Sequence, residues 1–577
     1  MMSLETLGDP ALPPAGADLP PQPRAWAAAD AVALLVLLAI ACASACLIDF
    51  HGFSDDQKTY IRIASDIISR PVRWYPPDSF AWVLAGLYRL CGGWAQTFTV
   101  VYGLFASLYL STAYICLRRL CFGATPAFAT TLISLVPHYT LGMTSWGFAG
   151  AEFVTARVMI LPVAVLLMTV FLTKRDTGRV TGIFPLAAAG SFLHLSSAFL
   201  FSILVVAYCL VRVRDLRRAL ADALAPLLLS TLVFAVLAYH LYFPPVTGGF
   251  DQLLLQVYET MSKVQGPRID ALDTAARTDL LWQAAYTGFW WTMFPPRLAD
   301  VAYVGAENVV VLAVAWLAWM KCARAGAQER VLAGRLAALA AGVAVTAYGF
   351  QTTDFLAWTL AGAAPKIFEE VRAFGFLYWP IYVAIGFAFE RLRGRLPGML
   401  LFAALLVSPT MAVRALPQTA KLSLRSAALQ YGPSNLNPEY LDKVLGLYAG
   451  SRAELERLAD AIGQAQRGRA CVVFGLEHEL KRSGCAVFVS YQDKRSPLHD
   501  PGGRALLEWY LSYEEIRSAV ESGEPDRIAD LAARYGANIA VLQRRVRDPR
   551  YLPLFDGERW HAYRILAGNG TARHVRP

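Results

Sequence analysis

Long apolar runs separated by short polar loops fill the first 415 residues of the chain. A run of about 20 apolar residues crosses a bilayer as one helix. By this rule the sequence predicts spans near residues 26–48, 97–117, 123–145, 153–173, 221–243, 304–320, 331–350, 373–389 and 397–415. Residues 180–211 are too long for one crossing and too short for two full ones, which indicates a hairpin of two short or broken helices. The pattern therefore predicts eleven crossings.

The segment Ala81 to Trp94 decides which ends of the spans face the cytoplasm. It has 14 residues with Arg89 inside, which is typical of an interfacial or re-entrant helix rather than a span. If it does not cross, the short loops rich in Lys and Arg, such as residues 118–119, 174–179 and 212–218, all share one side. Because positive loops face the cytoplasm, we predict a cytoplasmic N-terminus and an extracytoplasmic C-terminus.

Three pieces of the chain then lie outside: residues 49–80, 244–300 and 416–577. In the first piece, apolar residues recur at helical spacing and predict an amphipathic helix on the membrane surface: Ile61, Ala64, Ile67 and Ile68. Residues 1–24, rich in Pro and Ala, are expected to form a disordered cytoplasmic tail. The organisation is thus a tail, a transmembrane domain over residues 25–415 and an outer domain.

The outer domain has the pattern of a soluble α/β fold. Helices are expected at residues 437–448, 451–466, 504–522 and 525–535, and strands in CVVF, CAVFV, IAVL and HAYRIL. Gly536 ends a helix, and the run IAVL begins three residues later. The domain has no GxGxxG, P-loop or Ser-His-Asp grouping, which favours a binding or lid domain. Cys471 and Cys485 flank neighbouring strands, where a disulfide and two free buried thiols fit equally well.

Composition agrees with a membrane protein. The chain has 577 residues, 56% of them hydrophobic, and a mean hydropathy of +0.40, more apolar surface than a soluble domain needs. A net charge of +9 would suggest nucleic acid in a soluble chain. Here the basic residues lie in loops between apolar runs, so we expect no nucleic-acid partner. The cysteines show neither CxxC nor Cys/His spacing, which disfavours a zinc site.

Two adjacent carboxylates, Asp55 and Asp56, follow the first span directly. A membrane enzyme keeps a general base or a metal ligand at such a place just outside the lipid. Neighbouring side chains on a helix diverge, so we assign the catalytic role to Asp55 and the N-cap of the following helix to Asp56. The pair could also hold a divalent ion such as Mg or Mn. The alternative is that both carboxylates only solvate and cap the loop.

Further candidates are Glu152, Arg157, His194, Lys366 and Arg372. Glu152 and Arg157 lie at the start of the fourth span. Three roles fit them: a mutual ion pair, a contact to the substrate, or charges at the membrane interface. His194 lies at the break of the hairpin, where loosened backbone and a half-helix N-terminus can bind an anion; a satisfied core histidine is the alternative. Arg372 and Lys366 belong to a charged outer loop with Asp354, Glu369 and Glu370. Arg372 can hold a phosphate there in bidentate geometry, or anchor the span at the headgroups.

Together these features resemble membrane glycosyltransferases of the GT-C superfamily, which have many spans, an acidic residue and an amphipathic helix in the first outer loop, and an outer C-terminal domain. The segments CVVFGLEHELKRSGCAVFV, ALLEWYLSYEEI and DLAARYGANIAVL also look like the ends of uncharacterised bacterial multi-span proteins near that superfamily. The resemblance implies that Asp55 deprotonates an acceptor hydroxyl, which attacks the anomeric carbon of a polyprenyl-phosphate sugar, and that Arg372 contacts the lipid phosphate. It implies a bacterial inner membrane location, contact with membrane lipid, and an extracytoplasmic glycan, lipid or protein as acceptor.

The chain departs from known branches of that superfamily. It has no WWD-type motif, since Trp290 and Trp291 are followed by Thr292, and it has Asp-Asp where other branches have Asp-Glu, which leaves metal use open. Two other functions fit the pattern: a transporter or flippase of a lipid-linked or small anionic substrate, and a non-catalytic subunit of cell-envelope polysaccharide assembly.

Overall fold

The computed structural model of the chain describes residues 26–47, 55–69, 79–135, 138–140, 143–146, 154–174, 177–242, 250–286, 327–361, 370–392, 416–431, 445, 447–466, 471–475, 480, 483, 485–487 and 503–566. Within these ranges six helical stretches are long and apolar enough to cross a membrane. Three of them are α-helices alone: α1 (Ala28–Leu47), α4 (Trp94–Arg119) and α14 (Ala327–Ala361). In the other three a 3-10 helix, labelled η, leads into an α-helix: η3 (Ala156–Met159) into α6 (Ile160–Thr173), η4 (Val213–Asp215) into α10 (Leu216–Tyr242), and η5 (Glu370–Leu377) into α15 (Tyr378–Leu392).

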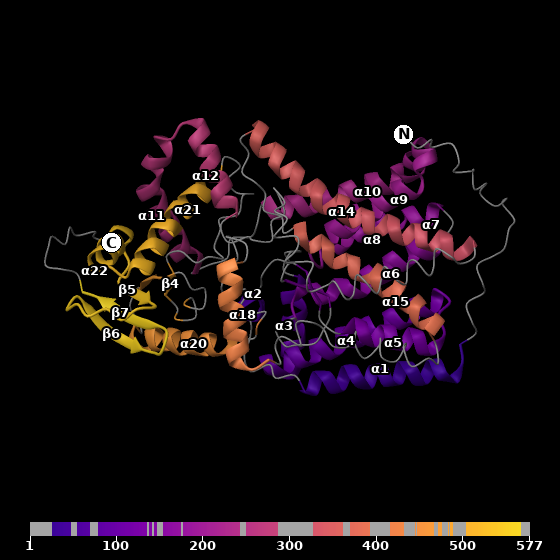
Figure 1. Cartoon of the computed structure of the whole chain (residues 1–577), viewed down its shortest axis with the longest axis horizontal. Coiled ribbons are helices and arrows are strands. Elements are labelled where there is room, and N and C mark those ends of the chain that lie inside the picture. Colours follow the sequence, from indigo (N-terminus) through magenta and orange to yellow (C-terminus); the bar gives the residue numbers. More distant parts are fainter. Residues whose placement is uncertain are drawn as a thin grey trace.

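These stretches confirm a polytopic α-helical membrane protein, and they confirm six of the predicted spans: those near residues 26–48, 97–117, 153–173, 221–243, 331–350 and 373–389. The spans predicted near residues 304–320 and 397–415 lie outside the described residues, so the count of eleven stays a prediction. Figure 1 shows the helical bundle on one side of the molecule and the C-terminal domain on the other.

The span predicted near residues 123–145 is wrong beyond its first half. Helix α5 covers Ala124–Leu135, and an antiparallel hairpin of β1 (His138–Thr140) and β2 (Met143–Trp146) follows. The sequence explains the change, because Pro137 cannot continue the helix and Gly142 favours a turn. The 12 residues of α5 extend about 18 Å, short of a bilayer core of about 30 Å.

The broken hairpin predicted over residues 180–211 is present. It consists of α7 (Thr177–Thr181), α8 (Ile183–Gly190) and α9 (Ser197–Val211), with His194 between α8 and α9. The two halves pack closely at Gly190, where an added Cβ would lie 2.4 Å from Ser197 Oγ and 3.0 Å from Ile160 Cδ1.

The segment between α1 and α4 contains two short helices, α2 (Asp55–Ser69), which lies in the predicted outer loop, and α3 (Ser79–Cys91). Helix α2 has the predicted amphipathic pattern, but its apolar face packs on protein, because Ala64 and Ile67 are buried beside α3. The ring of Tyr60 meets that of Phe80 edge-on at 5.0 Å. Helix α3 has 13 residues and is too short to qualify as a span, as predicted for this segment.

Helix α14 is longer than the predicted span, with 35 residues. Asp354, expected in a loop, therefore lies in a helix that continues past the apolar stretch Arg330–Phe350. In Figure 1 the far end of α14 extends towards the helix labelled α12 (Thr274–Tyr286).

A buried ion pair marks one end of the bundle, called here the Arg118 end. Arg118 on α4 donates to both carboxylate oxygens of Asp30 on α1, at 2.5 and 3.0 Å, and Tyr114 donates to the same carboxylate at 2.6 Å. Both ionised side chains are buried, so removing either would leave an uncompensated charge. The carboxyl-terminal end of α6 lies at this end too, where Arg335 of α14 donates to the carbonyl of Lys174 at 2.7 Å.

The C-terminal domain contains a five-stranded mixed sheet in the order β4-β3-β5-β7-β6. Its strands are β3 (Val472–Phe474), β4 (Ala486–Val487), β5 (Ile539–Leu542), β6 (Tyr551–Asp556) and β7 (His561–Ile565). Strand β3 is parallel to β4 and β5, and β7 is antiparallel to β5 and β6. Four strands match the predicted runs. Strand β6 was not predicted, because Pro553 argues against a strand except at a sheet edge, where β6 lies.

Helices cover both faces of this sheet. Helix α20 (Tyr448–Ala465) packs on one face, and α21 (Arg504–Ser522) and α22 (Pro525–Tyr535) pack on the other. Three predicted helices are thereby confirmed, with Gly536 ending α22 at a φ of 70°; the fourth, near residues 437–448, falls largely outside the described residues. Helix α18 (Gln418–Tyr431) was not predicted.

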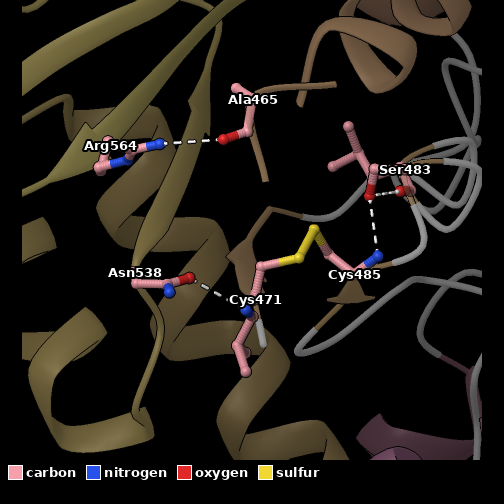
Figure 2. Close-up of a disulfide and its surroundings, with 8 residues drawn as sticks. Ala465, Cys471, Ser483, Cys485, Asn538 and Arg564 are labelled. Carbon is pink, nitrogen blue, oxygen red and sulfur yellow. Dashed lines mark hydrogen bonds between the residues drawn. A yellow bond between two sulfur atoms is a disulfide. The ribbon is translucent and has the colours of Figure 1, made fainter. Parts of the chain in front are cut away.

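Cys471 and Cys485 form a disulfide, one of the two states that the sequence left open. Figure 2 shows it beside Asn538, whose side chain accepts from the backbone of Val472 at 3.0 Å, and Ser483, whose hydroxyl accepts from the backbone of Cys485 at 3.2 Å. The bond fixes the start of β4 to the start of β3.

Candidate functional site

The start of α2 is attached to the bundle beside η3. The side-chain amide of Gln57 is fully buried and donates to the carbonyl of Val154 at 3.1 Å. Val154 lies two residues before η3. We call this the Gln57 end of the bundle, opposite the Arg118 end.

The two candidate carboxylates open this helix. Helix α2 begins at Asp55, so Asp56 lies in its first turn rather than at the expected N-cap position. Their side chains lie outside the described residues. The roles of Asp55 and Asp56 therefore stay predictions from the sequence, while the hydrogen bond of Gln57 places the start of their helix beside η3.

Of the predicted pair beside the fourth span, only Arg157 is described. It is half-buried and is the second residue of η3. Glu152 lies outside the described residues, so an ion pair between the two stays a prediction.

The turn between α8 and α9 reaches the same end of the bundle. Gly190, directly before the turn, packs on Ile160 at the start of α6. Helix α9 has 15 residues, so the turn lies about 20 Å along the helix axis from Val211, in a bilayer core of about 30 Å. Val211 lies towards the Arg118 end. The first part of helix α14, with Arg335, lies at that end, and the helix contacts α9 first at Ala207, through Gly342, and later at Phe199, through Phe350, so α9 runs in the opposite direction to α14. His194 is thus at the end of α9 nearer η3 and the start of α2.

His194 is held by its own turn. Its Nδ1 lies 2.6 Å from Ser196 Oγ and accepts the backbone N–H of Ser196 at 3.2 Å. Backbone N–H groups of the turn donate to carbonyls within it, including that of Ser197 to His194 and that of His194 to Gly190. The expected anion site made by open N–H groups of a half-helix is therefore largely closed. Polar side chains are the groups that this turn can offer.

Ser191 is such a side chain. It is fully buried, and among the described residues its hydroxyl has no hydrogen-bond partner. Its backbone N–H donates to Ala188, and the next two N–H groups repeat this short-range pattern.

Arg372 is the third residue of η5, and its side chain lies outside the described residues, as does all of Lys366. The element itself contacts β1, β2, α9 and α14. Trp146 of β2 fixes this region to the bundle, because its Nε1 donates to Tyr109 Oη at 2.5 Å and its ring packs on Tyr382.

Backbone that departs from the α-helix therefore gathers in one region: the β1–β2 hairpin, the 3-10 helices η3 and η5, and the turn at His194. At membrane depth such backbone is tolerated only where protein buries it or where it borders water, and broken helices recur at substrate sites of membrane proteins. Sequence analysis identified the turn and missed the hairpin and η5. Pro137 and Gly142 were the signals that could have found the hairpin.

Within the described ranges, no group of three or more His, Cys, Asp or Glu side chains is arranged to hold a metal ion. The Asp55–Asp56 pair, for which a divalent ion was considered, has its side chains outside those ranges.

A pair of helices that follows α10 in the chain packs on the C-terminal domain. Helix α11 (Phe250–Asp270) and helix α12 come from the second predicted outer piece, and both pack on α21 (Figure 1). Apolar side chains of the two helices share one core with the domain: Val257, Met261, Ile269, Leu281 and Ala284. The described part of this outer piece and the C-terminal domain therefore lie on the same side of the bundle.

Polar contacts at this interface centre on Gln265, which is fully buried. Its amide donates to Glu515 Oε2 at 3.0 Å and to Tyr535 Oη at 2.5 Å, and Tyr535 donates to Glu515 at 2.8 Å. Burial is the main cause that raises the pKa of the Tyr535 phenol above its ordinary value of 10.0. At the rim, Arg268 pairs with Glu515 at 2.5 Å, and Arg504 forms a bidentate pair with Asp270.

No family model matches the chain, and no curated protein matches it. Its structure is similar to a crystal structure of ArnT from Cupriavidus metallidurans bound to undecaprenyl phosphate, with 16% sequence identity, coverage of 93% of this chain and 98% of that chain, and a TM-score of 0.45. Values this low do not assign the chain to a family. What the described residues establish is a polytopic membrane protein with interrupted helices in its bundle and an α/β domain that packs on the α11–α12 hairpin.

Proposed function

We propose that this protein is a membrane glycosyltransferase of the GT-C type that moves a sugar from a polyprenyl-phosphate donor to an extracytoplasmic acceptor, with Asp55 as general base. One observation carries the proposal. Gln57 attaches the start of α2, and with it the acidic pair, to the end of the bundle where η3, η5 and the turn at His194 gather.

The reaction needs few parts. The acceptor hydroxyl attacks the anomeric carbon, its proton passes to the Asp55 carboxylate, and the bond from the anomeric carbon to the phosphate oxygen breaks. The departing polyprenyl phosphate takes the electron pair, and the Arg372 guanidinium stabilises its charge. A base, a cation at the phosphate and fixed positions suffice, so no nucleotide-binding fold is required.

The disulfide favours an outer location for the C-terminal domain, because such bonds persist in oxidising compartments. The docking of α11 and α12 keeps the second outer piece on that same side. Both observations agree with the orientation derived from the positive loops and support a lid or acceptor-binding role for the domain.

The second candidate, a carrier or flippase, would use the same broken helices but would bind its substrate near the bilayer midplane. The attachment of α2, which begins with the acidic pair, beside η3 at one end of the bundle favours the transferase. A flippase would move an unreacted lipid-linked sugar between leaflets of proteoliposomes, whereas the transferase consumes it.

The test compares a deletion strain with strains that express single variants. Deletion should make lipid-linked sugar accumulate, as resolved by mass spectrometry, and the wild-type gene should reverse this. Asp55→Asn should fail to reverse it and should lower transfer by about 10²- to 10⁴-fold, the usual contribution of a general base. The matched control is Asp66→Asn on the same helix, which should transfer normally. Full activity of Asp55→Asn at equal expression would remove Asp55 as base.

A further inference from the structure

The hydroxyl of Tyr109 connects three elements of the bundle. Tyr109 lies on α4, and its Oη accepts from the indole Nε1 of Trp146, the last residue of β2, at 2.5 Å. The same hydroxyl donates to the backbone carbonyl of Ser134 in the last turn of α5 at 3.3 Å. All three residues are buried. The hydroxyl therefore uses both its donor and its acceptor capacity inside the protein, on partners from two other elements.

These two bonds hold the open end of the β1–β2 hairpin. Trp146 pairs with His138, the first residue of β1, so the indole bond fixes the point where the chain enters and leaves the hairpin. Ser134 precedes β1 in the chain, and carbonyls in the last turn of a helix have no partner within that helix. Tyr109 supplies one. Loss of its hydroxyl would release the hairpin from α4 and take this partner from a buried carbonyl.

The hairpin in turn supports η5, the element that contains Arg372. It is a 3-10 helix of 8 residues, and such helices rarely exceed about 3–4 residues because their hydrogen bonds are poorly aligned. A long one persists where neighbouring elements hold it. Both strands of the hairpin contact η5, as do α9 and α14, and the ring of Trp146 lies 6.3 Å from that of Tyr382 on α15, which continues η5. Displacing the hairpin therefore removes part of what holds η5 in place.

Resting on the proposed function, which assigns Arg372 to the lipid phosphate, we infer that Tyr109 is a positioning residue: its hydroxyl holds the β1–β2 hairpin against η5 and thereby sets the position of Arg372. Tyr109 is fully buried in the bundle, so it acts through the hairpin rather than by contact with the substrate. A small displacement of a group that binds the substrate is costly, since about 1 Å can lower a rate by up to about 100-fold.

The experiment compares two tyrosines of α4. Tyr109→Phe removes one oxygen atom and keeps the ring, and Trp146→Phe removes the donor of the same bond. The matched control is Tyr114→Phe, which deletes an equally buried hydroxyl that donates to Asp30 at the Arg118 end. Hydrogen exchange of the η5 amides, measured on the full chain in nanodiscs, should rise about 3- to 10-fold in Tyr109→Phe and Trp146→Phe, the net value of one hydrogen bond.

The control and the double variant make this test specific. Tyr114→Phe should leave exchange in η5 unchanged even where it lowers thermal stability. The double variant Tyr109→Phe/Trp146→Phe should exchange no faster than Trp146→Phe alone, because both changes break one link. Unchanged exchange in Tyr109→Phe, or an equal rise in Tyr114→Phe, would overturn the inference.

Binding tests whether the effect passes through Arg372. Full-length protein in nanodiscs is titrated with a short prenyl phosphate, which Tyr109→Phe should bind about 10-fold more weakly than the wild type does, part of the value of contacts to a charged group. In an Arg372→Gln background the same change should weaken binding by less than about twofold. An equal further loss in that background would overturn the role assigned to Tyr109. Faster exchange in η5 and weaker phosphate binding, alongside a wild type that transfers no sugar, would refute the glycosyltransferase proposal and leave the positioning role intact.

Discussion

The buried Gln265 offers a quantitative test of how the C-terminal domain is attached. Replacing it by Leu keeps a similar volume and removes the amide that bonds Glu515 and Tyr535. The matched control is Gln283→Leu on α12, which removes an exposed amide that accepts from Tyr510 at 3.2 Å at the same interface.

The magnitude follows from the bonds that each change breaks. Gln265→Leu breaks three bonds: one donated to an ionised carboxylate, one donated to a phenol and one accepted from Arg268. The loss is about 2–3 kcal/mol, because Tyr535 keeps its bonds to Glu515 and Ser512, and Arg268 is half exposed and keeps its pair with Glu515. The exposed Gln283 should cost less than about 1 kcal/mol. Undocking of α11 should therefore become about 30- to 140-fold more frequent with Gln265→Leu and less than about fivefold more frequent with Gln283→Leu.

Hydrogen exchange measures this directly on the full chain in nanodiscs. Backbone amides in the second half of α11, near Met261 and Gln265, exchange through undocking because that stretch packs on α21 and α22. Exchange rates there should rise by the factors given above. Unchanged rates in Gln265→Leu, or equal rates in both variants, would refute the view that this buried network attaches the domain.

Three further predictions follow from other contacts. Asp30→Asn or Arg118→Met should each lower stability by about 3–5 kcal/mol, measured by thermal unfolding in nanodiscs, whereas replacing both residues by Leu should recover most of the loss. Arg550 holds the pKa of Asp548 at about 2, below its ordinary 3.8, so this contribution to stability is present above pH 3.8 and lost as pH falls through about 2. Protection of β6 amides should fall over that pH window, and Asp548→Asn should lack the effect. Replacing Cys471 and Cys485 by Ser should lower stability of the domain by about 3 kcal/mol, seen as faster proteolysis; unchanged proteolysis would contradict this.

The sequence predicts well what local pattern determines. The helix starting at Arg504 and the helix ending at Gly536 follow from apolar periodicity and a glycine cap, and the break at His194 follows from a run too long for one span. These features depend on residues close together in the chain.

Features that depend on distant partners could not be read in this way. Gln265 meets Tyr535 across 270 positions, and Arg118 meets Asp30 across 88, so neither pairing leaves a local signal. The β1–β2 hairpin was hidden for another reason. Its residues are apolar enough to extend a span, and hydropathy alone outweighed the helix-breaking effect of Pro137. The candidate site was thus predicted as single residues, while the interrupted backbone around it required the structure.

The most direct test of the central claim is an experimental structure of the full chain in nanodiscs with a bound prenyl phosphate. The proposal predicts one site at the Gln57 end, with the phosphate on the guanidinium of Arg372 and the carboxylate of Asp55 facing the carbon that bears it. A phosphate bound elsewhere, or packed protein between Asp55 and Arg372, would contradict it.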